Sequence, residues 1–314
     1  MNRREGITVY VLVVCTLFAG WASSAAERFS GSWTIVKSDE PGKVEFALIH
    51  QQHGNSSTHS STWPLSAFVG LDVSKPGKQD VKFSILRDAG KFDCEGYLDN
   101  GEGAGVFHFL ADSHYASEMN ALGFTGIDEE KQFSMAVMDV SLSFAKEMKN
   151  ERLEGLDTDK LIAFRIFNVN SAFIQELRDA GITVTDCDKL VAFRIHGVTP
   201  EMVRFLRKSG YQPDEDQLIA MRIHGATPEF IDKLAKEGYP HVDLNKLIAF
   251  RIHGVSPEFI EKVQSLGYRH PEPDQLIAMR IHGVTPEYIT GLKAKGVRNL
   301  SIDQLVSLRI QGID

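Results

Sequence analysis

A repeated phrase constrains the last two-thirds of this chain more than any other feature. The phrase LIAMRIHG occupies residues 276–283, and related copies recur at intervals of 28 or 29 residues. These copies begin at Leu161, Leu190, Leu218, Leu247, Leu276 and Leu305. A fixed period of this length is typical of a solenoid, in which neighbouring repeats bury each other's apolar faces.

A second phrase alternates with the first and marks the start of another helix. In TPEFI at residues 227–231, the threonine is an N-cap, the proline suits the first turn and the glutamate faces the positive end of the helix. Similar phrases begin at Thr199, Ser256 and Thr285. Gly238 is placed to end this helix.

The helix that carries the first phrase also has predicted ends. Its N-caps are Asp157, Asp186, Asp214, Asp243 and Ser301, and its closing glycines are Gly197, Gly225, Gly254 and Gly283. Both helices are about ten residues long, which is too short for stability in isolation. The repeats must therefore stack.

This periodicity divides residues 112–314 into seven two-helix repeats. They span residues 112–140, 141–169, 170–198, 199–226, 227–255, 256–284 and 285–314, and the first is a degenerate capping repeat.

Residues 27–111 have a different pattern. Short β-branched or aromatic runs at 32–36, 44–49, 81–86, 91–98 and 105–109 predict strands, and turn signals such as 39–42 separate them. Residues 55–62 are rich in Ser, Thr and Asn and predict an exposed loop. The expected fold class is α+β, with a small antiparallel β domain before an all-α solenoid.

The first 26 residues have the features of a signal peptide. Arg3 and Arg4 precede an apolar run at residues 7–22, and small residues follow at 23–26. The expected location is the periplasm or the extracellular space, with anchoring by an uncleaved signal segment as the alternative. No later stretch is apolar and long enough to span a bilayer.

The charged and sulfur-containing residues exclude several classes of function. The net charge is −8, and the excess of acids lies before residue 141. A nucleic-acid partner is not expected, because it would require a basic patch. Cys94 and Cys187 lie in different segments and are expected to be buried apolar residues, neither catalytic nor part of a disulfide framework. We predict no catalytic, cofactor-binding or metal-binding residues.

Two polar residues recur at fixed positions of the repeat. The arginines are Arg165, Arg194, Arg222, Arg251, Arg280 and Arg309, and the histidines are His196, His224, His253 and His282. The arginines form either a cationic stripe for an anionic partner or a structural ladder, in which each fork satisfies carbonyls or carboxylates of the next repeat. The histidines cap the negative ends of helices, bind a metal or form a pH-responsive surface.

The N-terminal segments resemble a known family. The runs at 31–35, 87–96 and 103–109, together with the repeats, are similar to the extracytoplasmic region appended to some beta-lactamase-regulator-type membrane zinc metallopeptidases. The chain has no His-Glu-x-x-His motif, so the resemblance carries over no catalytic residue. It implies a cell-envelope sensing or interaction module.

Three functions are compatible with the sequence. The first is non-enzymatic binding or scaffolding, in which the repeats present a surface to a protein or another cell-envelope component. The alternative is a ligand-sensing regulatory module. The third is an enzyme with a site in the β domain, which would have to bring together His50, His53, His59 and His108.

Overall fold

The computed structural model describes residues 29–52 and 55–313, and these form two compact units. One unit contains the segment up to Leu86 and Gly90–Ala111, and the other contains Arg87–Ala89 and Asp112–Asp314. The first is a sheet and the second is helical, which confirms the expected α+β class. The predicted domain boundaries did not anticipate that the turn at residues 87–89 groups with the helices. The predicted signal peptide lies outside the described residues.

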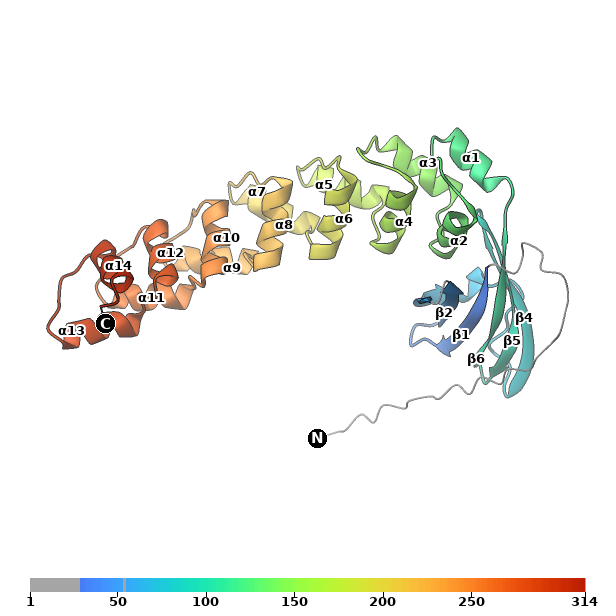
Figure 1. Cartoon of the computed structure of the whole chain (residues 1–314), viewed down its shortest axis with the longest axis horizontal. Coiled ribbons are helices and arrows are strands. Elements are labelled where there is room, and N and C mark those ends of the chain that lie inside the picture. Colours follow the sequence, from blue (N-terminus) through green and yellow to red (C-terminus); the bar gives the residue numbers. More distant parts are fainter. Residues whose placement is uncertain (1–28, 53–54, 314) are drawn as a thin grey trace. The chain divides into compact units, whose positions relative to one another are not determined.

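The sheet has six strands (Figure 1). They are β1 (Ser30–Lys37), β2 (Lys43–Gln52), β3 (Asn55–Pro64), β4 (Lys78–Arg87), β5 (Gly90–Asp99) and β6 (Glu102–Ala111). Their order in the sheet is β3-β2-β1-β6-β5-β4, so antiparallel pairing of β1 with β6 joins two three-stranded meanders.

The loop predicted at residues 55–62 is wrong, because these residues belong to β3. This strand pairs along its whole length with β2, from Lys43 opposite Pro64 to Gln52 opposite Asn55. Residues 56–62 are exposed, so the apolar alternation that signals a strand is missing. A polar sequence is suited to an edge strand, since it discourages pairing with other chains.

One face of the sheet forms the core of this unit. The rings of Phe46 on β2 and Phe83 on β4 lie 6.4 Å apart, although β1, β6 and β5 separate these strands in the sheet order. The sheet must therefore curl around its buried face. Trp33 is fully buried on β1 and lies over two facing glycines, because a Cβ atom at Gly96 or Gly105 would be 2.7 Å from its ring.

The helical unit contains fourteen short helices in the described residues (Figure 1). They are α1 (Tyr115–Ala121), α2 (Glu129–Val137), α3 (Leu142–Asn150), α4 (Thr158–Ile166), α5 (Ser171–Asp179), α6 (Cys187–His196), α7 (Pro200–Lys208), α8 (Glu215–His224), α9 (Pro228–Lys236), α10 (Leu244–His253), α11 (Pro257–Ser265), α12 (Pro273–Ile281), α13 (Pro286–Ala294) and α14 (Ile302–Ile310). Helices two apart in sequence pack together, so odd- and even-numbered helices form separate rows. None of the helices in the described ranges has the length and apolar character needed to cross a membrane.

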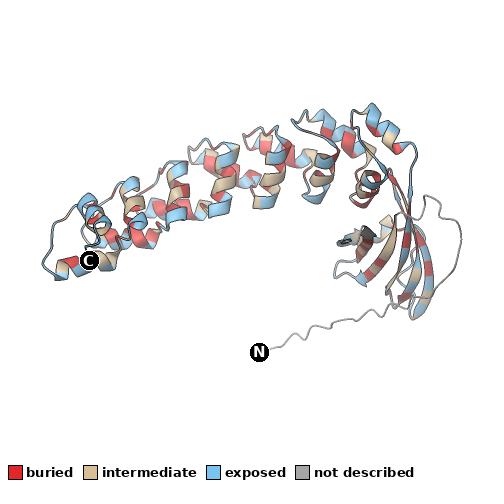
Figure 2. Cartoon of the chain, in the orientation of Figure 1, coloured by how far each residue is buried: buried red, intermediate tan, exposed pale blue. Residues whose placement is uncertain are grey.

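The helices begin at the predicted caps. The side chains of Thr199, Thr227, Ser256 and Thr285 each accept a hydrogen bond from the backbone N–H three residues later. Asp157, Asp186, Asp214, Asp243 and Ser301 cap the even-numbered helices. The opening leucines from Leu161 to Leu305 are at most 1% exposed, and Figure 2 shows the buried residues on the facing sides of the helices. The expectation that no repeat buries its apolar face alone agrees with this packing.

Both predicted buried cysteines are free and buried, one in each unit. Burial raises the pKa of the Cys94 thiol well above its usual range and that of Cys187 to about 12, where Asp186 adds to the effect. We expect iodoacetamide at pH 8 to alkylate both thiols at least about a hundredfold more slowly in the native protein than in urea, because the thiolate is the nucleophile. Peptide mapping by mass spectrometry measures each site separately. Rapid native alkylation of either cysteine would contradict its burial.

Candidate functional site

Several ladder arginines join their repeat to the one before it. Arg222 Nε donates to the His196 carbonyl at 3.1 Å, and Arg251 Nε donates to the His224 carbonyl at 3.3 Å. Arg280 makes the equivalent bond to His253. The structural interpretation predicted an acceptor in the next repeat, and this direction is wrong: the acceptor is the last turn of the preceding even-numbered helix.

Most of these guanidinium groups also lie over an aromatic ring of their own repeat. Arg194 is the closest, with its Cζ atom 3.7 Å from the centre of the Phe173 ring. The other pairs are Arg165 with Phe144, Arg251 with Phe230, Arg280 with Phe259 and Arg309 with Tyr288. A cation over an aromatic face is stabilising. Each such arginine therefore holds the odd-numbered helix of its repeat, and this geometry favours the structural reading of the ladder.

The glycine that closes one repeat leaves room for the ladder arginine of the following repeat. Gly254 has a φ of +73°, and a Cβ atom built there would lie 2.8 Å from Arg280 Nη2. Gly197, Gly225 and Gly283 make the same approach to Arg222, Arg251 and Arg309. The position requires glycine both for its backbone conformation and for the space that the arginine occupies.

Three glycine substitutions separate these two requirements. We expect Gly254→Ala to reduce the free energy of unfolding by about 2 kcal/mol, more than Gly267→Ala, because Gly267 has a positive φ and open space around it. Gly291→Ala, inside α13, is the control and should stabilise by about 0.5–1 kcal/mol. Urea unfolding followed by circular dichroism gives all three values. Equal losses at Gly254 and Gly267 would show that the contact with Arg280 contributes nothing.

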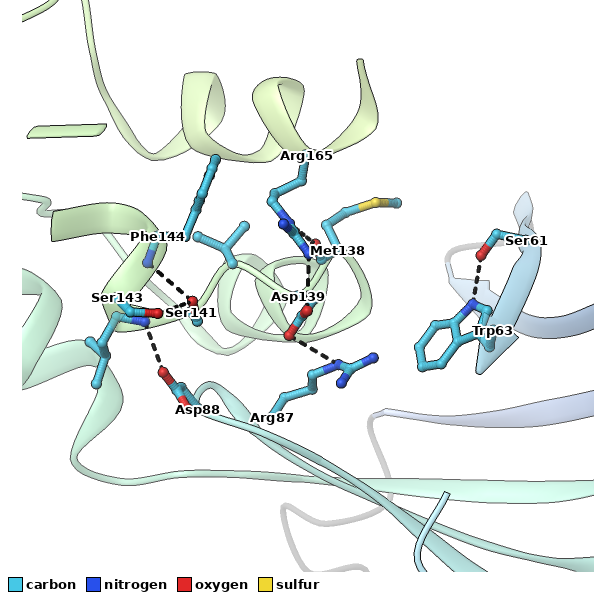
Figure 3. A network of polar contacts seen from close by, with 12 residues as sticks. Ser61, Trp63, Arg87, Asp88, Met138, Asp139, Ser141, Ser143, Phe144 and Arg165 are labelled. Atoms are coloured by element: carbon cyan, nitrogen blue, oxygen red, sulfur yellow. Dashed lines mark hydrogen bonds and ion pairs between the residues drawn. The ribbon is translucent and has the colours of Figure 1, made fainter. Parts of the chain in front are cut away.

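The first repeat closes with a carboxylate instead of a glycine (Figure 3). Asp139 has a φ of +55° and accepts a hydrogen bond from Arg165 Nη2 at 2.9 Å. Its other carboxylate oxygen lies 3.3 Å from Arg87 Nε. Burial lowers the pKa of the Arg87 guanidinium, and Asp139 opposes that effect by favouring the charged form. The turn that carries Arg87 is thus fixed to the first two repeats by charge.

The turn that carries Arg87 also supplies a carboxylate, that of Asp88, which caps a helix. Asp88 Oδ2 accepts a hydrogen bond from the backbone N–H of Leu142, the first residue of α3, at 2.9 Å. The N-cap Ser141 accepts a bond from Phe144 N–H, as Figure 3 shows. The amide of Gln132 on α2 also donates to the carbonyl of Ala89 at 2.8 Å. Residues 87–89 therefore complete the N-terminal end of the array.

The same glycine substitution at two equivalent positions tests the charge pair. Asn168 has the place in the second repeat that Asp139 has in the first, and both have a φ of +55°. We expect Asp139→Gly to reduce the free energy of unfolding by about 2 kcal/mol, because it leaves the guanidinium of Arg87 without its carboxylate. Asn168→Gly should be neutral or slightly stabilising, and thermal unfolding of the two variants measures the difference. Identical midpoints would exclude a role for the pair.

The histidine ladder lies at the ends of the even-numbered helices. His196, His224 and His253 are the last residues of α6, α8 and α10, and His282 is the C-cap of α12. This position suits the capping interpretation, because a helix C-terminus favours positive charge. Within the described ranges, no group of three or more His, Cys, Asp or Glu side chains is arranged to hold a metal ion.

The outward face of the even-numbered helices is apolar, and the sequence analysis missed it. The residue after each ladder arginine is an isoleucine, to which the sequence analysis gave no role. Ile166, Ile195, Ile223, Ile252, Ile281 and Ile310 are 53%, 54%, 54%, 52%, 54% and 63% exposed. Among the described helices of this unit, these are the only exposed large apolar residues, and all lie on one row.

The whole outward face repeats a four-residue pattern. In α10 it consists of Asn245, Ala249 and Ile252, spaced at i, i+4 and i+7 on one side of the helix, with the buried Ile248 at the border of that side. These four residues line a groove of about 500 Å³ between α8 and α10, together with Asp216, Gln217 and Ala220. The pattern Asp-x-x-Ile-Ala-x-x-Ile could have revealed the face, because it is a second apolar stripe opposite the buried one.

A ladder of ion pairs runs along the N-terminal edge of this face. The pairs join neighbouring repeats and are Lys131 with Asp159, Lys160 with Asp188, Lys189 with Asp216, and Lys246 with Asp274. Between the last two of these pairs, the equivalent contact is a hydrogen bond between side-chain amides, in which Gln217 Nε2 donates to Asn245 Oδ1 at 3.1 Å. The carboxylates are 72–79% exposed, whereas the lysine side chains are only 25–40% exposed. The edge therefore presents mainly oxygen atoms to solvent.

Within the described residues, the histidines of the sheet belong to no group of three or more potential metal ligands. His50 is buried, with Nδ1 2.9 Å from the Ser30 carbonyl. His59 lies on β3, where burial lowers its pKa, and His108 lies on β6 opposite Asp93. His53 lies outside the described residues. A groove of about 920 Å³ in this unit is lined by residues of β1, β2, β4, β5 and β6 such as Tyr97 and Val106.

The comparisons with known proteins add no functional assignment. No protein-family model matches the chain, and the search of curated proteins finds no relative.

Proposed function

We propose that the chain is a non-enzymatic scaffold that binds a partner protein along the outward face of helices α4, α6, α8, α10, α12 and α14. The single observation that carries this proposal is the ladder of six half-exposed isoleucines on that face. Large exposed apolar surfaces on soluble proteins mark interaction sites. The outer faces of the odd-numbered helices are charged instead, as at Glu229, Asp232 and Lys236 on α9.

The half-exposed isoleucines are separate from the stripe that holds each helix in the array. From α4 to α12, each even-numbered helix already buries its leucine and its phenylalanine or methionine inside the unit, as Leu247 and Phe250 do on α10. A helix that is apolar on two sides is suited to burial on both. In this proposal, the partner buries the outward apolar side of these helices.

We place this activity outside the cytoplasm, on the basis of the signal peptide predicted at residues 1–26. The resemblance to regions appended to membrane zinc metallopeptidases supports the same location and a cell-envelope partner. An uncleaved signal segment would keep the scaffold at the membrane surface.

The sheet supports a second candidate function, the sensing of a small ligand. The groove of about 920 Å³ on β1, β2, β4, β5 and β6 has the size of a ligand pocket. Its exposed Tyr97 and Val106 side chains offer apolar contacts to such a ligand.

Capture from cell-envelope extract tests the scaffold. We expect the mature chain to retain a specific set of proteins, and the triple variant Ile195→Gln, Ile223→Gln, Ile252→Gln to bind them about a hundredfold more weakly. Burying the exposed half of three isoleucines is worth about 3 kcal/mol in total. Quantitative mass spectrometry of the retained proteins measures the loss.

The matched control is Val36→Gln, Leu110→Gln, which removes two exposed apolar side chains, 49% and 42% exposed, from the sheet. This variant should retain the same proteins as the unmodified chain. Loss of binding in the sheet variant alone would refute the helical surface. Equal retention by all three proteins would also refute it.

A further inference from the structure

The partner of this face can be specified further, and this inference rests on the proposed function. Three properties of the face decide what fits it: the spacing of its apolar residues, the lack of groups that pair a foreign backbone, and the charge along one edge. The spacing and the lack of pairing groups distinguish a helical partner from an extended one. The charge distinguishes a basic partner from an acidic one.

The spacing of the grooves suits an α-helix. Helices that pack side by side lie about 8–10 Å apart, so successive isoleucines of the ladder are separated by about that distance. Seven residues of an α-helix advance by about 10.5 Å, whereas alternate residues of a strand advance by about 6.6 Å. A helix lying along the row, with apolar residues in every heptad, therefore meets successive grooves, and a strand does not.

The chemistry of the face also disfavours an extended chain. Its central positions are alanine and isoleucine, such as Ala220, Ala249 and Ile252, which neither donate nor accept hydrogen bonds. The nearest amides, Gln217 and Asn245, bond to each other. An extended peptide would bury unpaired backbone groups there, whereas a helix satisfies its own backbone. The small alanines leave room for close approach.

The charged edge sets the sign of the partner. Asp159, Asp188, Asp216 and Asp274 lie beside the apolar face and are more exposed than the lysines that pair with them and balance their charge. The capping acids Asp186 and Asp214 give the same ends of the helices a net negative charge. A partner with lysine or arginine along one flank complements this edge, and an acidic flank is repelled.

We infer that the outward face of the even-numbered helices binds an amphipathic α-helix of a partner protein. The helix lies along the row and places one apolar residue per heptad in each groove. Its basic flank follows the aspartate ladder.

Synthetic peptides of 28 residues test this inference with the full mature chain. The first peptide has leucines at heptad spacing, Lys along one flank and Glu along the other. The second has the Lys flank replaced by Glu, and the third has the composition of the first with apolar and polar residues alternating as in a strand. Fluorescence anisotropy at low and moderate salt gives the dissociation constants, and hydrogen exchange locates the contact.

We expect the first peptide to bind at least tenfold more tightly than either of the others, with protection on α6, α8 and α10 and weaker binding at higher salt. Ile223→Gln, Ile252→Gln should weaken its binding at least tenfold. Asp188→Asn, Asp216→Asn should remove the preference over the second peptide. Val36→Gln, Leu110→Gln should change nothing.

Three results would overturn the inference. They are equal or tighter binding of the strand peptide, equal binding of the Glu-flanked peptide, and sedimentation of the chain alone as a dimer that the Ile223→Gln, Ile252→Gln variant disrupts. The outcome is separable from the proposed function. If envelope proteins are still captured through the isoleucines while the first peptide fails, the scaffold stands and the helical partner is wrong.

Discussion

The helical unit depends on the fact that none of its helices is long enough to be stable alone. A helix of nine or ten residues pays the cost of nucleation without enough hydrogen bonds to offset it, so each must be held by its neighbours. The arginine of each repeat is central to this support, because several of these side chains stack on a ring of their own repeat and also bond the helix end of the preceding one. Where the arginine approaches the closing glycine of the preceding repeat, as Arg280 does at Gly254, little room is left for a side chain at that glycine. Function is then confined to surfaces that the junctions do not use.

The even-numbered helices provide such a surface, since their two sides serve different purposes. The inner side is packed against the neighbouring row, and the outer side remains apolar without a described contact that explains it. The odd-numbered helices show that exposed positions in this array can be charged. The contrast between the two rows supports the proposal that the outer isoleucines serve recognition.

Sequence alone predicts the parts of this structure that depend on local signals. The period, the caps at residues such as Thr227 and Asp214, and the glycine ends are short-range features, and the helices follow them closely. Strand β3 escapes prediction because an edge strand exposed to water lacks apolar alternation. The direction of the arginine contacts also depends on how repeats are placed in space, which no spacing along the chain reveals. The isoleucine face was visible as a pattern, but an apolar residue on a helix is ordinarily assigned to the core, and only exposure distinguishes the two.

The ladder arginines bond the repeat that precedes their own in the sequence, and this direction bears on the order in which the repeats can assemble. The first repeat has Ala136 where later repeats have arginine, and no earlier repeat precedes it. Arg165, Arg222, Arg251 and Arg280 each bond a repeat made before their own, so a chain emerging from its N-terminal end has an earlier repeat on which to add the next hairpin. Assembly can therefore follow synthesis or translocation one hairpin at a time, with each new hairpin also covering the apolar face that the previous one leaves open.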